Sequence, residues 1–248
     1  MIIIKTRSEI EIMRQGGKIL AQVLAAVAAK AKEGVTTAEL NFLAEKLIKQ
    51  SKGEPSFKNY RGYPATICAS INDEIVHGIP HNDKILKNGD IMGLDIGLKY
   101  QGLYSDMAVT IPIGKIHKSA KRLINVTKKA LELSLRQVRP GHTLGDIGFA
   151  IQNYVESNGM NVVRDLVGHG VGKEVHEEPK IPNYGEANAG QELSEGMTLA
   201  IEPMVVLGSP EISVDEDGWT ARTADGQLAA HFEVTVAVTK DGFQILTK

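Results

Sequence analysis

The segment GLDIGLKYQGLYSDMAVT, residues 93–110, holds two runs of β-favouring residues joined by a turn at Gln101-Gly102. Asp95 lies in the first run, and Asp106 lies in the second run, eleven residues later. Two such runs around a glycine-containing turn are typical of an antiparallel hairpin, which would bring both carboxylates together. A buried carboxylate is costly unless it is paired or binds a metal. The alternative is that one aspartate caps a turn and the other faces water.

More β-rich runs precede and include this hairpin. From Pro64 to Thr110 they alternate with turn-forming pairs, which include Asn72-Asp73 and Asn88-Gly89. We therefore predict a set of antiparallel strands in this part of the chain.

Two helices are predicted before these strands. Ser8 with Glu11 and Thr36 with Glu39 each fit a capping box, and apolar residues recur at helical spacing after each box. The first helix is expected to continue toward Gly34. The second is expected to end near residue 53.

The same order then recurs. Helices predicted at about 118–138 and 143–157 lead into a second β-rich stretch, about 110 residues after the first pair. We predict an internally duplicated α+β fold, with an antiparallel sheet flanked by helices. Because no linker-like stretch divides the chain, residues 1–248 are predicted to form one domain with halves of about 1–115 and 116–248.

Composition excludes several classes of protein. The formal net charge is −2, so no overall field attracts nucleic acid or an anionic membrane. Cys68 is the only cysteine, which excludes an intrachain disulfide and predicts a reducing, cytoplasmic compartment. Charged residues interrupt the apolar N-terminal stretch, and the longest weakly polar run, 19–29, is shorter than a membrane span. We expect neither a signal peptide nor a membrane-spanning helix.

Two glutamates lie among apolar strand residues in the second half. Glu202 belongs to GMTLAIEPMVV, residues 196–206, and Glu233 belongs to LAAHFEVTVAVT, residues 228–239. A single glutamate in a strand usually faces solvent. Two glutamates, each within an apolar strand pattern, make solvent exposure a less satisfactory explanation for both.

The segment GHGVGKEVHEEP, residues 168–179, places two histidines among glycines and a proline. Its glycines and proline favour turns and extended chain, which excludes a helical HExxH site. One such histidine together with the four strand acids forms an oxygen-dominated set, large enough for two divalent cations. Four carboxylates balance the charge of two such ions, and the set favours Mn²⁺, Fe²⁺ or Co²⁺ over a structural zinc.

Five motifs stand in one order along the chain: NDEIVHGIP, LDIG with SDMAVT, GHGVGKEVHEEP, LAIEPM and HFEVTV. In this order and spacing the chain resembles the type I methionine aminopeptidases over essentially its whole length. The resemblance implies a pita-bread α+β fold with pseudo-twofold symmetry, in agreement with the duplication. It places the metal ligands at Asp95, Asp106, His169, Glu202 and Glu233.

The resemblance also implies an activity. The family releases N-terminal methionine from nascent proteins and peptides with a small second residue, through a hydroxide that bridges two divalent ions, with Mn, Fe(II), Co and also Zn as candidates. Glu202 would be the general base and proton shuttle. His176 would stabilise the oxyanion, and His77 would contact the scissile amide and assist the leaving amine.

A pocket for the methionine side chain is implied by the same resemblance. Its residues would be Phe57, Tyr60, Tyr63, Cys68, His77, Val175, His176 and Trp219. For Cys68 a plain buried hydrophobe is an equally good interpretation, and Trp219 also fits a core aromatic.

The sequence departs from the family pattern at Arg61, Val175, His231 and Val234, where the family usually has histidine, phenylalanine, glutamine and histidine. None is a metal ligand, so the chemistry is expected to survive. Val175 removes a ring from the pocket and Arg61 adds a permanent charge, so side-chain preference is expected to change.

Peptide and nascent-chain N-termini are the expected partners, with transient ribosome contact, and the chain is expected to be a monomer. One alternative is an X-Pro aminopeptidase or prolidase, which shares the ligand set but carries a large N-terminal domain, whereas Ile3 here leads almost at once into the first helix. The other is a non-catalytic pita-bread binding protein, which should have lost ligands.

Overall fold

The computed structural model describes residues 1–248, and its central feature is the predicted hairpin. Strands β4 (Ile91–Tyr100) and β5 (Leu103–Pro112) pair antiparallel around Gln101 (φ 48°) and Gly102 (φ 83°). The register pairs Asp95 with Ala108 and Gly97 with Asp106. Since residues opposite one another share a face of the sheet, the two aspartates are diagonal neighbours on one face.

This hairpin belongs to a nine-stranded antiparallel sheet with strand order β1-β4-β5-β14-β9-β7-β8, in which β2 also pairs with β4 and β15 with β14. The other strands are β1 (Glu54–Pro55), β2 (Ile67–Ile71), β7 (Val167–Gly170), β8 (Glu177–Pro182), β9 (Thr198–Ile201), β14 (Glu233–Thr239) and β15 (Gly242–Ile245). The hairpin therefore lies beside strands from the end of the chain.

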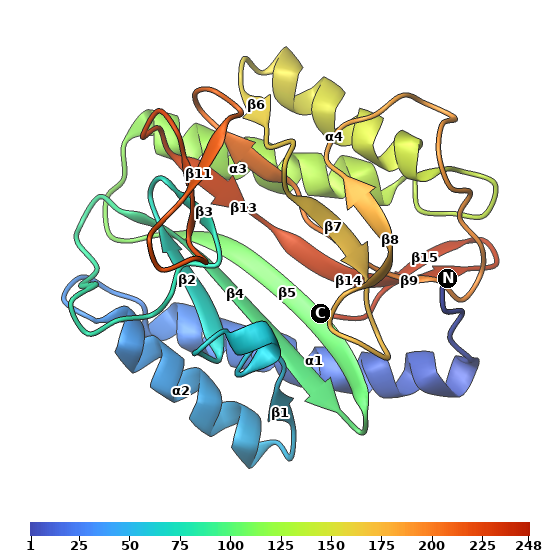
Figure 1. Cartoon of the computed structure of the whole chain (residues 1–248), viewed down its shortest axis with the longest axis horizontal. Helices are drawn as coiled ribbons and strands as arrows, with labels where there is room; N and C mark the ends of the chain where they lie inside the picture. The colour runs from blue at the N-terminus through green and yellow to red at the C-terminus, as the bar shows by residue number, and fades with distance from the viewer.

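Four helices cover the sheet: α1 (Arg7–Lys30), α2 (Thr37–Gln50), α3 (Lys118–Leu135) and α4 (Leu144–Ser157). Figure 1 shows α1 and α3 behind the strands, so that the opposite face of the sheet is turned toward the viewer. Leu20 and Leu40 pack with Leu94 in one apolar core, and Leu123 and Ile147 pack with other strands in a second core. The helices thus cover one face of the sheet and leave the opposite face uncovered by helix.

The first helix begins with a different cap from the one predicted. Thr6 is the N-cap, and its hydroxyl accepts a hydrogen bond from the backbone N–H of Glu9, whose carboxylate accepts from the N–H of Thr6. Ser8 and Glu11 have the same spacing but lie inside the helix, where Glu11 accepts hydrogen bonds from Arg14 instead. The Ser8–Glu11 prediction was wrong because two overlapping boxes fit the pattern, and only the earlier one precedes the helix. The Thr36–Glu39 box was correct.

The chain also forms two small three-stranded sheets. One has the order β13 (Ala229–His231), β10 (Met204–Val206) and β6 (Asn161–Val162), and the other has β11 (Ile212–Val214), β12 (Ala221–Thr223) and β3 (Glu74–Val76). The end of β3 presents His77, and the segment before β12 presents Trp219. A short 3₁₀ turn, η1 (Tyr60–Gly62), carries Tyr60, which packs against the same apolar cluster as Trp219.

No helix combines the length and the apolar character that a membrane crossing requires.

Candidate metal centre

The five predicted ligands come from adjacent strands and line one cavity of about 230 Å³. Asp95 lies on β4, Asp106 on β5, His169 on β7 and Glu233 at the start of β14, while Glu202 directly follows β9. The strand order brings residues separated by more than a hundred positions in the sequence to one place on the sheet.

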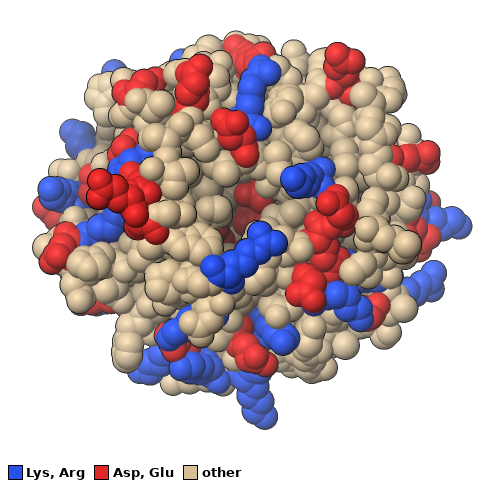
Figure 2. Space-filling view, in the orientation of Figure 1, with Lys and Arg blue, Asp and Glu red and all other residues tan.

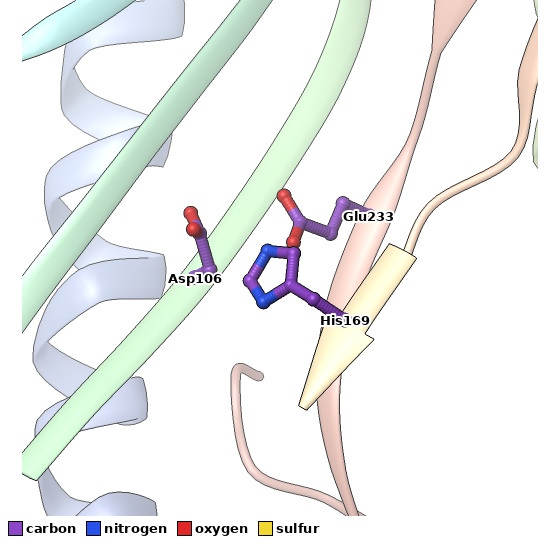
Figure 3. A group of neighbouring side chains, drawn as sticks. All are labelled: Asp106, His169 and Glu233. Carbon is purple, nitrogen blue, oxygen red and sulfur yellow. The ribbon is translucent and has the colours of Figure 1, made fainter. Parts of the chain in front are cut away.

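Three of these side chains form the tightest group. Ligand atoms of Asp106, His169 and Glu233 all lie within 4.8 Å of one another. Figure 3 shows the carboxyl groups of Asp106 and Glu233 gathered near the His169 ring. Glu202 joins the group through its Oε1, 3.6 Å from His169 Nε2. Asp95 lies beside it, diagonal to Asp106 across the pairing of β4 with β5.

The unsatisfied atoms of this group fit a divalent cation. Asp95 Oδ1 and Glu233 Oε1 are buried and have no hydrogen-bond partner. His169 Nδ1 lies 2.8 Å from the carbonyl oxygen of Gly170, so it carries the proton and donates, which leaves the Nε2 lone pair free for a metal. Carboxylate oxygens with one such nitrogen suit a hard or borderline divalent ion.

Burial raises the pKa of every carboxyl in the group. The pKa of Asp95 and of Glu233 lies well above its usual value because of burial, and neighbouring carboxyls raise it further. Burial likewise raises the pKa of Glu202 to about 8 and that of Asp106 to about 6. Metal binding requires the deprotonated forms, so cations would be bound at the expense of protons.

We expect the chelator-treated protein to lose stability as pH rises. Its buried carboxyls hold protons that the unfolded chain releases near pH 4.5, so unfolding free energy falls between about pH 5 and about pH 8. Thermal unfolding across this range measures the effect, and Mn²⁺ should remove most of it. The isosteric Glu233→Gln variant, which has one fewer buried acid, should have a shallower slope. An unchanged slope in that variant would contradict this origin of the pH dependence.

Two further histidines border the group. The His176 ring lies 4.2 Å from that of His169 and 5.2 Å from that of Tyr60. Partial loss of water around the ring, followed by the charges of His169, His77 and Arg61, lowers the His176 pKa to about 3, although part of the residue stays exposed to solvent. His77, at φ 59° and beside Trp219, has its pKa lowered to about 4, mainly by burial. Both rings are therefore neutral near pH 7 and can each donate one N–H hydrogen bond.

One end of the cavity is apolar. An apolar cluster consists of Phe57, Tyr63, Ala65, Cys68 and Val175, with Tyr60 and Trp219 packed against it. Phe57, Tyr60, Tyr63, Cys68 and Trp219 line the cavity. Val175 is in the apolar cluster but is not among the lining residues. Most of the predicted pocket residues are thus gathered at one end of the cavity.

His231 is a contact of the group that the sequence analysis treated only as a departure. It is 3% exposed, and its Nε2 lies 3.3 Å from Glu202 Oε2. Thr110 fixes its backbone on both sides, through hydrogen bonds at its N–H and its C=O. It ends β13, two residues before Glu233 begins β14 in the large sheet.

A buried ion pair holds the loop that carries His176. Lys5 donates to the Glu177 carboxylate, and these side chains are 1% and 3% exposed. The same carboxylate accepts a hydrogen bond from the Glu174 backbone N–H at 3.0 Å. The loop between β7 and β8 is therefore fastened to the first residues of the chain.

The site consists of four carboxylates and an imidazole on an antiparallel sheet that helices cover on one side. This arrangement indicates a metal-dependent hydrolase. A sequence model of metallopeptidase family M24 matches residues 11–240, and the chain belongs to this family. Within the family it is a member of the methionine aminopeptidases. It is 50% identical over 247 residues to a methionine aminopeptidase from Clostridium acetobutylicum, with 100% of this chain and 99% of that protein covered.

Solved structures agree with this placement. The crystal structure of a methionine aminopeptidase from Thermotoga maritima superposes with a TM-score of 0.98 at 48% identity, and each chain is covered fully. A prolidase from Pyrococcus horikoshii has a TM-score of 0.81 at 26% identity, but only 63% of its chain is covered. The predicted pita-bread fold is confirmed, and the prolidase-like alternative is not favoured.

Proposed function

We propose that this chain releases the N-terminal methionine from peptides and nascent proteins whose second residue is small. The proposal rests on one observation: the carboxylate–histidine group and residues of the apolar cluster line the same cavity. Such a cavity can hold an apolar first side chain beside a centre that hydrolyses the following bond. The high identity to methionine aminopeptidases over the full chain supports the same substrate.

Two divalent cations are proposed as cofactors, held by Asp95, Asp106, His169, Glu202 and Glu233. When bound, such ions lower the pKa of a water molecule and polarise the scissile carbonyl. The donor set favours Mn²⁺, Fe²⁺ or Co²⁺ over a structural zinc, because it has one nitrogen and no sulfur, and Zn²⁺ stays a candidate.

The surrounding side chains supply the remaining steps. Glu202 accepts the proton of the attacking water and passes it toward the leaving amine. The neutral His176 donates its N–H to the oxyanion of the tetrahedral intermediate. His77, across the cavity beside Trp219, hydrogen-bonds the scissile amide and assists departure of the amine. The cavity-lining rings and Cys68 contact the methionine thioether, which suits aromatic and sulfur neighbours.

We propose the cytoplasm as the compartment, in keeping with the single cysteine. We also propose a monomer that forms one domain of two pseudo-symmetric halves, about 1–115 and 116–248. The repeated order of two helices followed by strands supports this division. Contact with the ribosome would be transient, since a net charge of −2 offers no overall attraction to RNA.

A peptide panel tests the proposed function. The protein loaded separately with Mn²⁺, Fe²⁺, Co²⁺ or Zn²⁺ should release methionine from Met-Ala-Ser, much more slowly from Met-Phe-Ser, and not cut Ala-Pro-Gly. Chromatography of the released amino acid measures each rate. Cleavage of the proline peptide with Met-Ala-Ser left intact would overturn the proposal in favour of an X-Pro peptidase. No cleavage by any metal form would favour a binding protein.

A further inference from the structure

Arg61 is a permanent cation at the open side of the metal-centre cavity. Among the residues that line the cavity, only Arg61 and His176 are exposed, so the cavity opens to solvent on their side. Arg61 is also the only lysine or arginine in the lining. Figure 2 shows acidic atoms inside a hollow near the middle of this face and a basic side chain across its rim. A peptide held at the centre must therefore extend past His176 and Arg61.

A series of neighbouring side chains connects Arg61 to the centre. The guanidinium Cζ lies 5.3 Å above the centroid of the Tyr60 ring. That ring lies 5.2 Å from the His176 ring, which in turn lies 4.2 Å from the ring of His169. The guanidinium therefore lies at most about 10 Å from the His176 ring, a distance that an extended peptide covers in three residues or fewer.

The guanidinium itself is available for binding. It makes no hydrogen bond and no ion pair within the chain, and its close neighbour is the Tyr60 ring. By contrast, the nearby Lys58 is paired with Glu45 at 2.9 Å. Five N–H donors of Arg61 are therefore free for an acceptor that arrives with the substrate.

The backbone holds Arg61 in an unusual conformation. Its φ is 50° and its ψ is 24°, in the left-handed region, which is costly for a residue with a side chain. Asn59 before it and Gly62 after it also have positive φ, at 69° and 91°. Residues kept in this region are concentrated at functional sites, where the surroundings fix them. Here that conformation belongs to the residue whose side chain borders the cavity.

We propose that Arg61 binds a carboxylate of the substrate, carried by its third or fourth residue. This inference rests on the proposed function and names a class of substrate for the same site. The second residue must be small, so the third residue is the first that can carry an acidic side chain within reach. A guanidinium pairs with a carboxylate through two parallel hydrogen bonds, in a geometry that a neutral or cationic side chain cannot match. The carboxylate could also be the C-terminus of a peptide of three or four residues.

Amidated tetrapeptides separate binding of an acidic side chain from binding of the C-terminal carboxylate. Met-Ala-Asp-Ala, Met-Ala-Ala-Ala and Met-Ala-Lys-Ala, each as the C-terminal amide, are compared with the Mn²⁺-loaded enzyme at low ionic strength. We expect the aspartate peptide to have roughly 5-fold higher kcat/KM than the lysine peptide, through KM, because a solvent-exposed pair contributes little more than this. Met-Ala-Ala as the free acid and as the amide tests the C-terminal source. A preference for the free acid without one for aspartate would assign the carboxylate to the C-terminus.

Arg61→Asn is the informative variant, because asparagine tolerates the left-handed backbone and removes the charge. It should bring the aspartate and lysine peptides to nearly equal KM. Lys58→Gln is the matched control, since it removes one positive charge three residues away, outside the cavity lining, and should keep the preference. Methionine release with no preference for an anionic peptide, or a preference that persists in Arg61→Asn, would overturn the role of Arg61. Failure to release methionine from any peptide would instead overturn the proposed function, and this inference with it.

Discussion

Glu202→Gln is expected to lower kcat for methionine release on the order of 10⁴-fold, at the upper end of what one acid–base group supplies. The Glu202 carboxyl lies between two imidazoles, 3.6 Å from His169 Nε2 and 3.3 Å from His231 Nε2. Glutamine keeps its shape but can neither accept the proton nor contribute a negative charge. The variant should therefore lose catalysis and also bind its cations less tightly, as calorimetry with Mn²⁺ would measure.

The control for this change is Glu178→Gln. Glu178 is an exposed glutamate in the segment after His176, outside the cavity lining, and its loss should leave both kcat and metal affinity near those of the wild type. A Glu202→Gln enzyme that kept more than about a tenth of its activity would show that another group moves the proton.

His176→Ala is expected to slow turnover by about 10²- to 10³-fold with metal affinity unchanged, the usual cost of removing one oxyanion donor. The pKa of His176, about 3, keeps this ring neutral across the working range, so it contributes an N–H and no charge. The loss should fall on kcat, since the donor contacts an oxygen whose charge develops only in the transition state. Steady-state kinetics together with Mn²⁺ calorimetry measure both quantities.

Two companion variants sharpen this test. His176→Asn retains an N–H donor and should recover part of the rate. His81→Ala removes an exposed histidine that lies near Asp83 and should have no effect. Loss of Mn²⁺ binding in His176→Ala would mean that His176, and not His169 alone, belongs to the ligand set.

The sequence predicted the elements that depend on local pattern. The hairpin at 93–110 and the four helices were found because strand alternation, helical spacing and turn residues are all local properties. The wrong cap at Ser8 also came from a local pattern, because two overlapping stretches of the chain both fit a capping box. Choosing between them required knowing that the chain is already helical from Arg7.

The candidate site could be predicted as a set of residues, but not as an arrangement. Residue types and motif order selected the acids and His169, whereas the pairing of β14 with β5 and β9 brings them together. Val175 is in the apolar cluster, outside the cavity lining, and His231 lies against Glu202. Neither position follows from local pattern, because each depends on contacts between distant segments.

The ion pair of Lys5 and Glu177 joins residues 172 positions apart and is almost fully shielded from water. Breaking it would leave a lone charge in the interior, a cost of several kcal/mol for a buried pair. Release of the segment before α1 and displacement of the loop that carries His176 are therefore one cooperative opening, and neither occurs cheaply without the other. The segment before α1 thus holds in place the loop that carries His176, the proposed oxyanion donor, although it contributes no atom to the proposed reaction.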